Sequence, residues 1–219
     1  PKPLIELNGK PLFVRAIESV RVEGAPMKYS FIVRKEHIDD YGVDRSIRAI
    51  LPEANIYSVE KTTRGAVETC LIAENGIDDD DTVVVMDCDL EFRSNEYRRL
   101  IEAALNTAGD KARGGALVSF ESDEPKYSYA EVGDDGLVKR TAEKEVISNH
   151  ALCGAYFFAS GREFKAAAHR LLDEPVMLKP EFYVSLLYNY LLRDGSPVRL
   201  ATMEMYRSYG TPEELKQWQ

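Results

Sequence analysis

The feature that most constrains the fold is an alternation of strand and helix patterns over the first 120 residues. Residues 82–86 form a continuous, mostly β-branched run after an acidic turn, as expected of a strand that is buried on both faces. Residues 11–22 instead carry apolar side chains at helical spacing. Alternation of this kind predicts a mostly parallel sheet with helices on both faces.

The same two patterns predict the remaining elements. Strands are expected over residues 29–33, 54–59, 115–120, 152–158 and 198–203. Helices are expected over residues 44–51, 65–74, 97–105, 163–172 and 182–192. Residues 127–139 differ, because two β runs flank Asp134-Asp135-Gly136, which is a hairpin signal. We therefore expect a single α/β domain over residues 1–219, Rossmann-like, with a small antiparallel β lobe.

Composition excludes several classes of function. The net charge of −9 argues against nucleic acid as the main partner, because phosphate backbones are held by an excess of Lys and Arg. No apolar run reaches the roughly 18 residues that span a bilayer, so we expect no membrane segment. The three cysteines, Cys70, Cys88 and Cys153, have no metal-type spacing and indicate reduced thiols of a cytoplasmic protein.

Two carboxylates follow the predicted strand at residues 82–86. In open α/β sheets ligands bind beyond the carboxyl ends of the strands, where Asp87 and Asp89 lie. Because they are separated by one residue in an extended chain, they can point the same way and form an oxygen site for Mg²⁺ or Mn²⁺. Such a metal would neutralise charge on a triphosphate. The alternative is that the acids merely cap the next turn.

Other polar segments have both a functional and a structural interpretation. Lys2 lies between two prolines that restrict its backbone, although a solvated lysine is the commoner case. Glu143 and Lys144 follow the hairpin as adjacent opposite charges, which on a surface contribute little to stability. Thr63 and Gly65 precede a predicted helix, where a glycine allows close approach of a flat ligand. On this segment alone we favour an ordinary helix N-cap by Thr63.

The remaining polar groups indicate no catalytic centre of their own. The acidic run 78–81 is interpreted as a solvated turn and not as a metal site. The three histidines, His37, His150 and His169, are scattered along the chain and support no triad. The serines lack the setting of a nucleophile elbow.

Taken in order, six motifs resemble the sugar-1-phosphate nucleotidyltransferases, the family that includes glucose-1-phosphate thymidylyltransferases and mannose-1-phosphate guanylyltransferases. The likeness covers nearly the whole chain, and its strength comes from the order of motifs that are individually weak. Residues 143–148 and 181–184 look most like a branch associated with capsule or lipopolysaccharide biosynthesis. The six motifs are Pro1-Lys2-Pro3-Leu4-Ile5 with Asn8-Gly9-Lys10-Pro11, Arg64-Gly65-Ala66, Met86-Asp87-Cys88-Asp89, Ala142-Glu143-Lys144, Gly154-Ala155-Tyr156-Phe157-Phe158, and Gly210-Thr211-Pro212-Glu213-Glu214-Leu215.

The resemblance implies a nucleotide-diphospho-sugar transferase fold and a role for each matched residue. Lys2 would hold phosphates at the reaction centre, and Lys144 would bind the phosphate of the sugar. Asp89 would bind Mg²⁺ or Mn²⁺, with Asp87 as a second ligand. The substrates would be a nucleoside triphosphate and a sugar 1-phosphate. The substrate-binding positions would be Thr63, Gly65, Tyr129, Glu143, Gly154 and Glu181.

Two departures from the family pattern accompany this resemblance. Members normally begin with a strand and a glycine-rich loop that holds the triphosphate, ahead of the segment that matches Pro1. We therefore expect this sequence to lack the first strand and the phosphate-binding loop, either because upstream residues have been omitted, which we favour, or because the protein is a degenerate relative. Many relatives also place a metal-binding Asp where this chain has Ser208.

Two alternatives stay open. Asp87-Cys88-Asp89 is also a DxD signature of glycosyltransferases that consume nucleotide sugars, and a non-catalytic regulatory relative would keep the fold without turnover. The base, the sugar or other phosphorylated acceptor, and the oligomeric state, including a homo-oligomer, are left undetermined.

Overall fold

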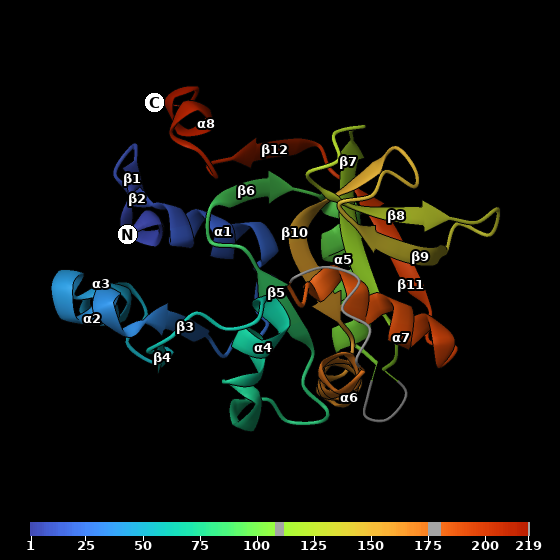
Figure 1. Ribbon diagram of the computed structural model, residues 1–219, viewed down its shortest axis with the longest axis horizontal. Coiled ribbons are helices and arrows are strands. Elements are labelled where there is room, and N and C mark those ends of the chain that lie inside the picture. The colour runs from blue at the N-terminus through green and yellow to red at the C-terminus, as the bar shows by residue number, and fades with distance from the viewer. Residues whose placement is uncertain (108–111, 175–180, 219) are drawn as a thin grey trace.

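A six-stranded sheet forms the centre of the molecule in the computed structural model, which describes residues 1–107, 112–174 and 181–218 (Figure 1). Its strands follow the order β11-β7-β10-β8-β9, and β5 pairs with β10 beside this path. The strands are β5 (Val83–Met86), β7 (Gly115–Glu121), β8 (Ser128–Val132), β9 (Val138–Glu143), β10 (His150–Phe158) and β11 (Val198–Thr202).

Strand β10 organises this sheet. It runs antiparallel to β5, β7 and β8, whereas β11 pairs with β7 in parallel. Strands β5, β7 and β11 therefore point in one direction, as the alternating pattern predicted for β5 and β7, and β10 runs the opposite way between β5 and β7. The register of β10 against β7 shifts between Leu152 and Tyr156, around Gly154, which has a positive φ of 85°.

Helices cover both faces of the sheet, which confirms the predicted α/β class. On β10, Leu152, Tyr156 and Phe158 belong to the apolar cluster under α6 (Gly161–Asp173) and α7 (Leu187–Arg193). Cys153, Ala155 and Phe157 belong to the cluster on the other face, with α1 (Leu12–Val20) and α5 (Asn95–Leu105). Successive side chains of a strand point to opposite faces, so one strand contributes to both cores.

Strand β5 differs from the expectation of complete burial. Its side chains contact both apolar clusters, Val83 and Val85 on one face and Val84 and Met86 on the other. All four residues are nevertheless only partly buried. Within the residues described, β5 forms a ladder along a single edge, with β10, and this leaves its other edge less covered.

A smaller unit packs beside the sheet. Strands β3 (Ser30–Arg34) and β4 (Asn55–Val59) pair in parallel, and α2 (Lys35–Tyr41) and α3 (Val43–Ile50) connect them in sequence. Its core contains Phe13, Val43, Ile47 and Ala54. In the described part of the chain β3 pairs only with β4, so no ladder joins this unit to the six-stranded sheet.

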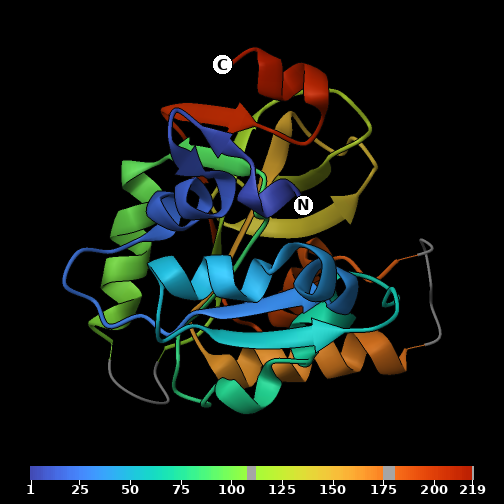
Figure 2. The same ribbon diagram turned by 90° about the vertical axis from the view of Figure 1, so that its left-hand side faces the viewer.

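The two ends of the described chain pack together (Figures 1 and 2). Leu7, Leu12 and Tyr209 form a buried cluster against which Leu215 and Trp218 pack. The N-terminal elements are η1 (Lys2–Leu4), β1 (Glu6–Leu7) and β2 (Lys10–Pro11), and the C-terminal ones are β12 (Met205–Ser208) and α8 (Pro212–Lys216). Strand β12 pairs antiparallel with β6 (Leu90–Arg93), directly after Asp89. A search of the described residues finds no helix long and apolar enough to cross a membrane.

Candidate active site

Lys2 and Asp89, 87 positions apart in sequence, form an ion pair at the carboxyl end of β5. Lys2 Nζ donates to Asp89 Oδ2 at 2.8 Å and to the carbonyl oxygen of Gly210 at 2.9 Å. The hydrogen bond to Asp89 raises the pKa of Lys2 above its ordinary value, although partial burial opposes the rise. Three segments, the N-terminus, the β5–β6 turn and the turn before α8, thus meet at one ammonium group.

A buried ion-pair network holds these segments in place. Glu91 on β6 accepts from Arg15 Nη1 of α1 at 2.9 Å and from Arg207 Nη1 of β12 at 2.7 Å. The Tyr209 amide donates to the carbonyl of Asp89 at 2.8 Å. The sequence analysis did not identify Glu91, because an acid next to a candidate metal ligand gives no pattern of its own.

Asp87 lies against the backbone of β10. Its amide donates to the carbonyl of Gly154 at 3.0 Å, and a Cβ on Gly154 would overlap Asp87 Oδ2. Glycine at this position therefore provides the space that the carboxylate occupies. Desolvation by the surrounding protein raises the pKa of Asp87 to about 7, and the negative charges of Asp89 and Glu143 add to the rise while Lys2 opposes it. The side chain keeps access to solvent, so screening weakens the rise without reversing its direction.

Glu143, at the end of β9, is a buried carboxylate with two hydroxyl donors. It is 7% exposed, and its Oε2 accepts from Ser128 Oγ of β8 and from Ser185 Oγ at 2.8 Å. Ser128 is directly opposite Glu143 in the β8–β9 register. Charge-assisted hydrogen bonds of this kind compensate the cost of burying a carboxylate.

Lys144 has a backbone conformation unusual for a residue with a side chain. Its φ is 53°, in the left-handed region, and its amide donates to the Tyr127 carbonyl at 3.0 Å. Nζ donates to the Tyr183 hydroxyl at 2.7 Å, and this contact raises the pKa of Lys144 above its ordinary value. Strained residues of this kind concentrate at functional sites.

The segment before α4 (Ala66–Leu71) corrects one expectation. Thr63 does not cap this helix, because Gly65 is the N-cap residue and no side chain caps the helix there. The Thr63 hydroxyl instead contacts Thr69 Oγ1 at 2.6 Å and donates to the Gly65 carbonyl at 3.1 Å. Gly65 has a φ of 143° and lies directly against the backbone of Phe182, where a Cβ would come within 2.7 Å of the carbonyl oxygen.

Electrostatic interactions relate these charged groups to one another. The charges of Asp89 and Glu143 both act on Asp87, and the charges of Glu143 and Glu181 act on Lys144. Lys2 is bound to Asp89 directly. Three carboxylates, Asp89, Asp87 and Glu143, therefore link Lys2 to Lys144 through a series of charge interactions.

A sequence model of the protein family described as nucleotidyl transferase matches residues 1–185. The chain belongs to the nucleotidyl transferase family. Two solved structures share its fold. A nucleoside-diphosphate-sugar pyrophosphorylase from Vibrio cholerae RC9 has a TM-score of 0.81 at 23% identity, covering 100% of this chain and 91% of the other. A putative glucose-1-phosphate thymidylyltransferase from Bacillus anthracis, in complex with a sucrose, has a TM-score of 0.73 at 18% identity, covering 99% and 84%.

In this nucleotidyl transferase two carboxylates, Asp87 and Asp89, are the candidate donors for a metal ion. Asp89 is ion-paired with Lys2, and the charge of Lys2 also acts on Asp87. Among the described residues no cluster of three or more His, Cys, Asp or Glu side chains could hold a metal ion. Mg²⁺ is commonly held by one or two carboxylates and completed by water and phosphate oxygens, so the two residues fit this ion.

The other predicted site residues are less closely joined to this set. Tyr129 is fully buried, and its hydroxyl donates to the carbonyl of Glu124 at 2.7 Å. Glu181 is exposed and reaches Lys144 only through its charge. Sequence reasoning missed Ser128, Tyr183 and Ser185 as partners of the Glu143-Lys144 pair, since their contacts join residues that are distant in sequence.

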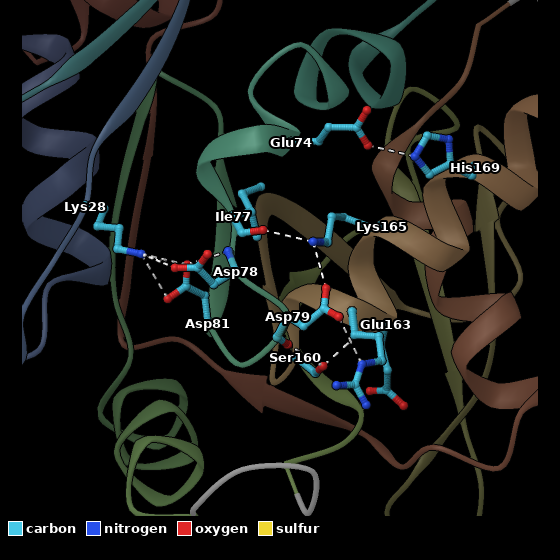
Figure 3. Close-up of polar contacts among 11 residues, drawn as sticks. Lys28, Glu74, Ile77, Asp78, Asp79, Asp81, Ser160, Glu163, Lys165 and His169 are labelled. Carbon is cyan, nitrogen blue, oxygen red and sulfur yellow. Dashed lines mark hydrogen bonds and ion pairs between the residues drawn. The ribbon is translucent and has the colours of Figure 1, made fainter.

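The acidic run 78–81 forms an exposed turn, as predicted, and its carboxylates make structural ion pairs (Figure 3). Asp79 Oδ1 pairs with Lys165 Nζ of α6 at 2.8 Å. Lys28 Nζ pairs with Asp78 at 2.9 Å and Asp81 at 3.1 Å. These contacts fasten the turn before β5 to α6 and to the segment before β3.

Proposed function

We propose that the protein joins a nucleoside triphosphate to a sugar 1-phosphate, giving a nucleotide sugar and pyrophosphate. The observation that carries this proposal is the arrangement of Lys2, Asp89 and Asp87 next to Glu143 and Lys144 beyond the carboxyl end of β5, in a member of the nucleotidyl transferase family. Two ammonium groups separated by carboxylates suit a reaction between two anionic substrates.

In the proposed reaction, an oxygen of the sugar phosphate attacks the α-phosphorus of the triphosphate. A new P–O bond forms while the bond from the α-phosphorus to the bridging oxygen breaks, and pyrophosphate leaves with that electron pair. Lys2 would stabilise charge on the triphosphate, and Lys144 would orient the sugar phosphate. Chemistry of this kind depends on positioning and charge neutralisation and needs no covalent nucleophile.

Asp89 and Asp87 would hold Mg²⁺ or Mn²⁺. The bound ion would neutralise triphosphate charge and polarise the α-phosphoryl group. Lys2 is paired with Asp89, so its ammonium lies beside the proposed metal ligand, where it would neutralise phosphate charge.

The remaining roles follow the family resemblance. Thr63 and Gly65 would lie near the base, while Glu143, Gly154 and Glu181 would contact the sugar. Tyr129 is buried on β8 opposite Ala142, so it would act by supporting the strand that carries Glu143. We also propose that the protein works in the cytoplasm and supplies nucleotide sugar for capsule or lipopolysaccharide synthesis, on the likeness of residues 143–148 and 181–184 to that branch.

A second candidate is a glycosyltransferase, favoured by the spacing of Asp87 and Asp89. The two functions differ in the phosphate product. Purified protein is incubated with Mg²⁺, each nucleoside triphosphate and a panel of sugar 1-phosphates, and pyrophosphate is measured. Parallel reactions contain nucleotide sugars, and release of nucleoside diphosphate is measured. Pyrophosphate that depends on both substrates supports the proposal, whereas nucleoside diphosphate release alone overturns it.

A further inference from the structure

One short stretch of the chain, residues 182–185, touches both halves of the proposed site. Phe182 contacts the Arg64–Gly65 turn, which we assign to the nucleotide. Tyr183 and Ser185 contact Lys144 and Glu143, which we assign to the sugar phosphate. We refer to residues 182–185 as the coupling segment.

The first attachment is made by backbone atoms. The Phe182 amide donates to the Arg64 carbonyl at 2.9 Å, and the Val67 amide donates to the Phe182 carbonyl at 3.0 Å. Gly65 lies between these two bonds with no space for a Cβ between it and Phe182. The Arg64 guanidinium is centred 5.0 Å from the Phe182 ring. The turn and Phe182 therefore move together or lose these contacts.

The second attachment is made by side chains. The Tyr183 hydroxyl accepts from Lys144 Nζ at 2.7 Å, and Ser185 Oγ donates to Glu143 Oε2 at 2.8 Å. Ser185 is fully buried, and its carbonyl accepts from Thr141 Oγ1 at 2.7 Å. Because Glu143 accepts from Ser185, its orientation depends on the position of this segment.

We propose that the coupling segment makes the two substrates bind cooperatively, with Tyr183 and Ser185 as positioning residues for Lys144 and Glu143. This inference rests on the proposed function. Nucleotide bound at the Arg64–Gly65 turn restrains Phe182, and the restraint passes through Tyr183 and Ser185 to the sugar-phosphate pair. The second substrate then binds a pair that is already ordered, so its affinity rises.

The test measures binding without turnover. Isothermal titration calorimetry gives the Kd of each sugar 1-phosphate in the panel, with and without a saturating, Mg²⁺-bound α,β-methylene triphosphate that cannot react. For the tightest pair we expect the triphosphate to tighten sugar-phosphate binding by about 10-fold in the wild type, within the usual range of coupling between sites. In Tyr183→Phe and in Ser185→Ala this ratio should fall to about 2-fold or less. The triphosphate alone should bind these variants as it binds the wild type.

Tyr190→Phe is the matched control, because its hydroxyl donates to Glu174 at 2.9 Å, a residue that belongs neither to the coupling segment nor to the proposed site. It should keep the wild-type ratio. If both ligands bind but the wild type shows no coupling, or if Tyr183→Phe and Ser185→Ala retain it, the inference is wrong and the proposed function stands. If neither ligand binds the wild type, the inference and the proposed function are both overturned.

Discussion

Replacing Gly65 with alanine tests the tight contact between the Arg64–Gly65 turn and Phe182. Gly65 adopts φ 143° and ψ 179°, a region that is essentially restricted to glycine. Forcing alanine into it costs about 1–3 kcal/mol. The added Cβ would also overlap the backbone of Phe182, which cannot rotate away as a side chain could.

Relief of that overlap requires the Arg64–Gly65 turn and the segment at Phe182 to move apart. Separation would weaken the Phe182–Arg64 and Val67–Phe182 hydrogen bonds, each worth about 1 kcal/mol net. We therefore expect Gly65→Ala to lower the free energy of unfolding by about 3–5 kcal/mol. The assay is urea unfolding at 25 °C followed by far-UV circular dichroism, with the free energy extrapolated to water.

Gly136→Ala is a control that measures the conformational cost of alanine at a positive φ without any steric overlap. Gly136 has a positive φ of 74° in the β8–β9 turn, and no atom lies within 4 Å of the position that an added methyl group would take. This variant should lose only about 1 kcal/mol. If Gly65→Ala is no less stable than Gly136→Ala, the contact with Phe182 is not rigid, and the mechanical basis of the coupling segment fails with it.

Three further substitutions test the charged groups. Lys144→Ala should cost about 2–4 kcal/mol of transition-state stabilisation, seen as a fall in kcat/KM, and an unchanged rate would remove Lys144 from the site. Asp89→Asn should abolish Mg²⁺-dependent binding of nucleoside triphosphate in calorimetry while the circular dichroism spectrum is retained; surviving metal dependence would place the ligand elsewhere. Asp87→Asn should stabilise the protein in EDTA, because folding raises the pKa of Asp87 from 3.8 to about 7 and so disfavours its charged form. The gain should be absent below pH 4, grow up to about pH 7, and reach about 1–2 kcal/mol after allowance for solvent screening; a gain that is equal at pH 4 and pH 8 would contradict this origin.

Periodic apolar patterns predicted most of the fold. The pattern over residues 11–22 corresponds to α1 at Leu12–Val20, and the hairpin signal at 134–136 lies between β8 and β9. The sequence analysis missed α2, Lys35–Tyr41, because that helix has no buried residue and therefore no apolar stripe. It also missed β6 and β12, four residues each, which exist through pairing with each other across more than a hundred positions.

Residues of the candidate site were predictable only where a short stretch of sequence around them forms a recognisable pattern. Asp87 and Asp89 follow a recognisable strand, and Lys2 lies between two prolines, so each could be found from its neighbours. Ser185 reaches Glu143 across 42 positions, and no local pattern encodes that contact. The Thr63 cap was wrong for a similar reason: the contact of Gly65 with Phe182 decides where α4 begins, and Phe182 is far along the chain.

The central place of β10 has a consequence for biosynthesis. β10 is the shared neighbour of β5, β7 and β8, yet its residues, 150–158, leave the ribosome after all three. Until then the apolar faces of β5 and β7 have no common partner, and their pairing edges are open to other nascent chains. Strands β5, β7 and β8 are therefore joined only when β10 has been made, before β11 adds to the β7 edge, and early release of the polypeptide would leave an aggregation-prone intermediate.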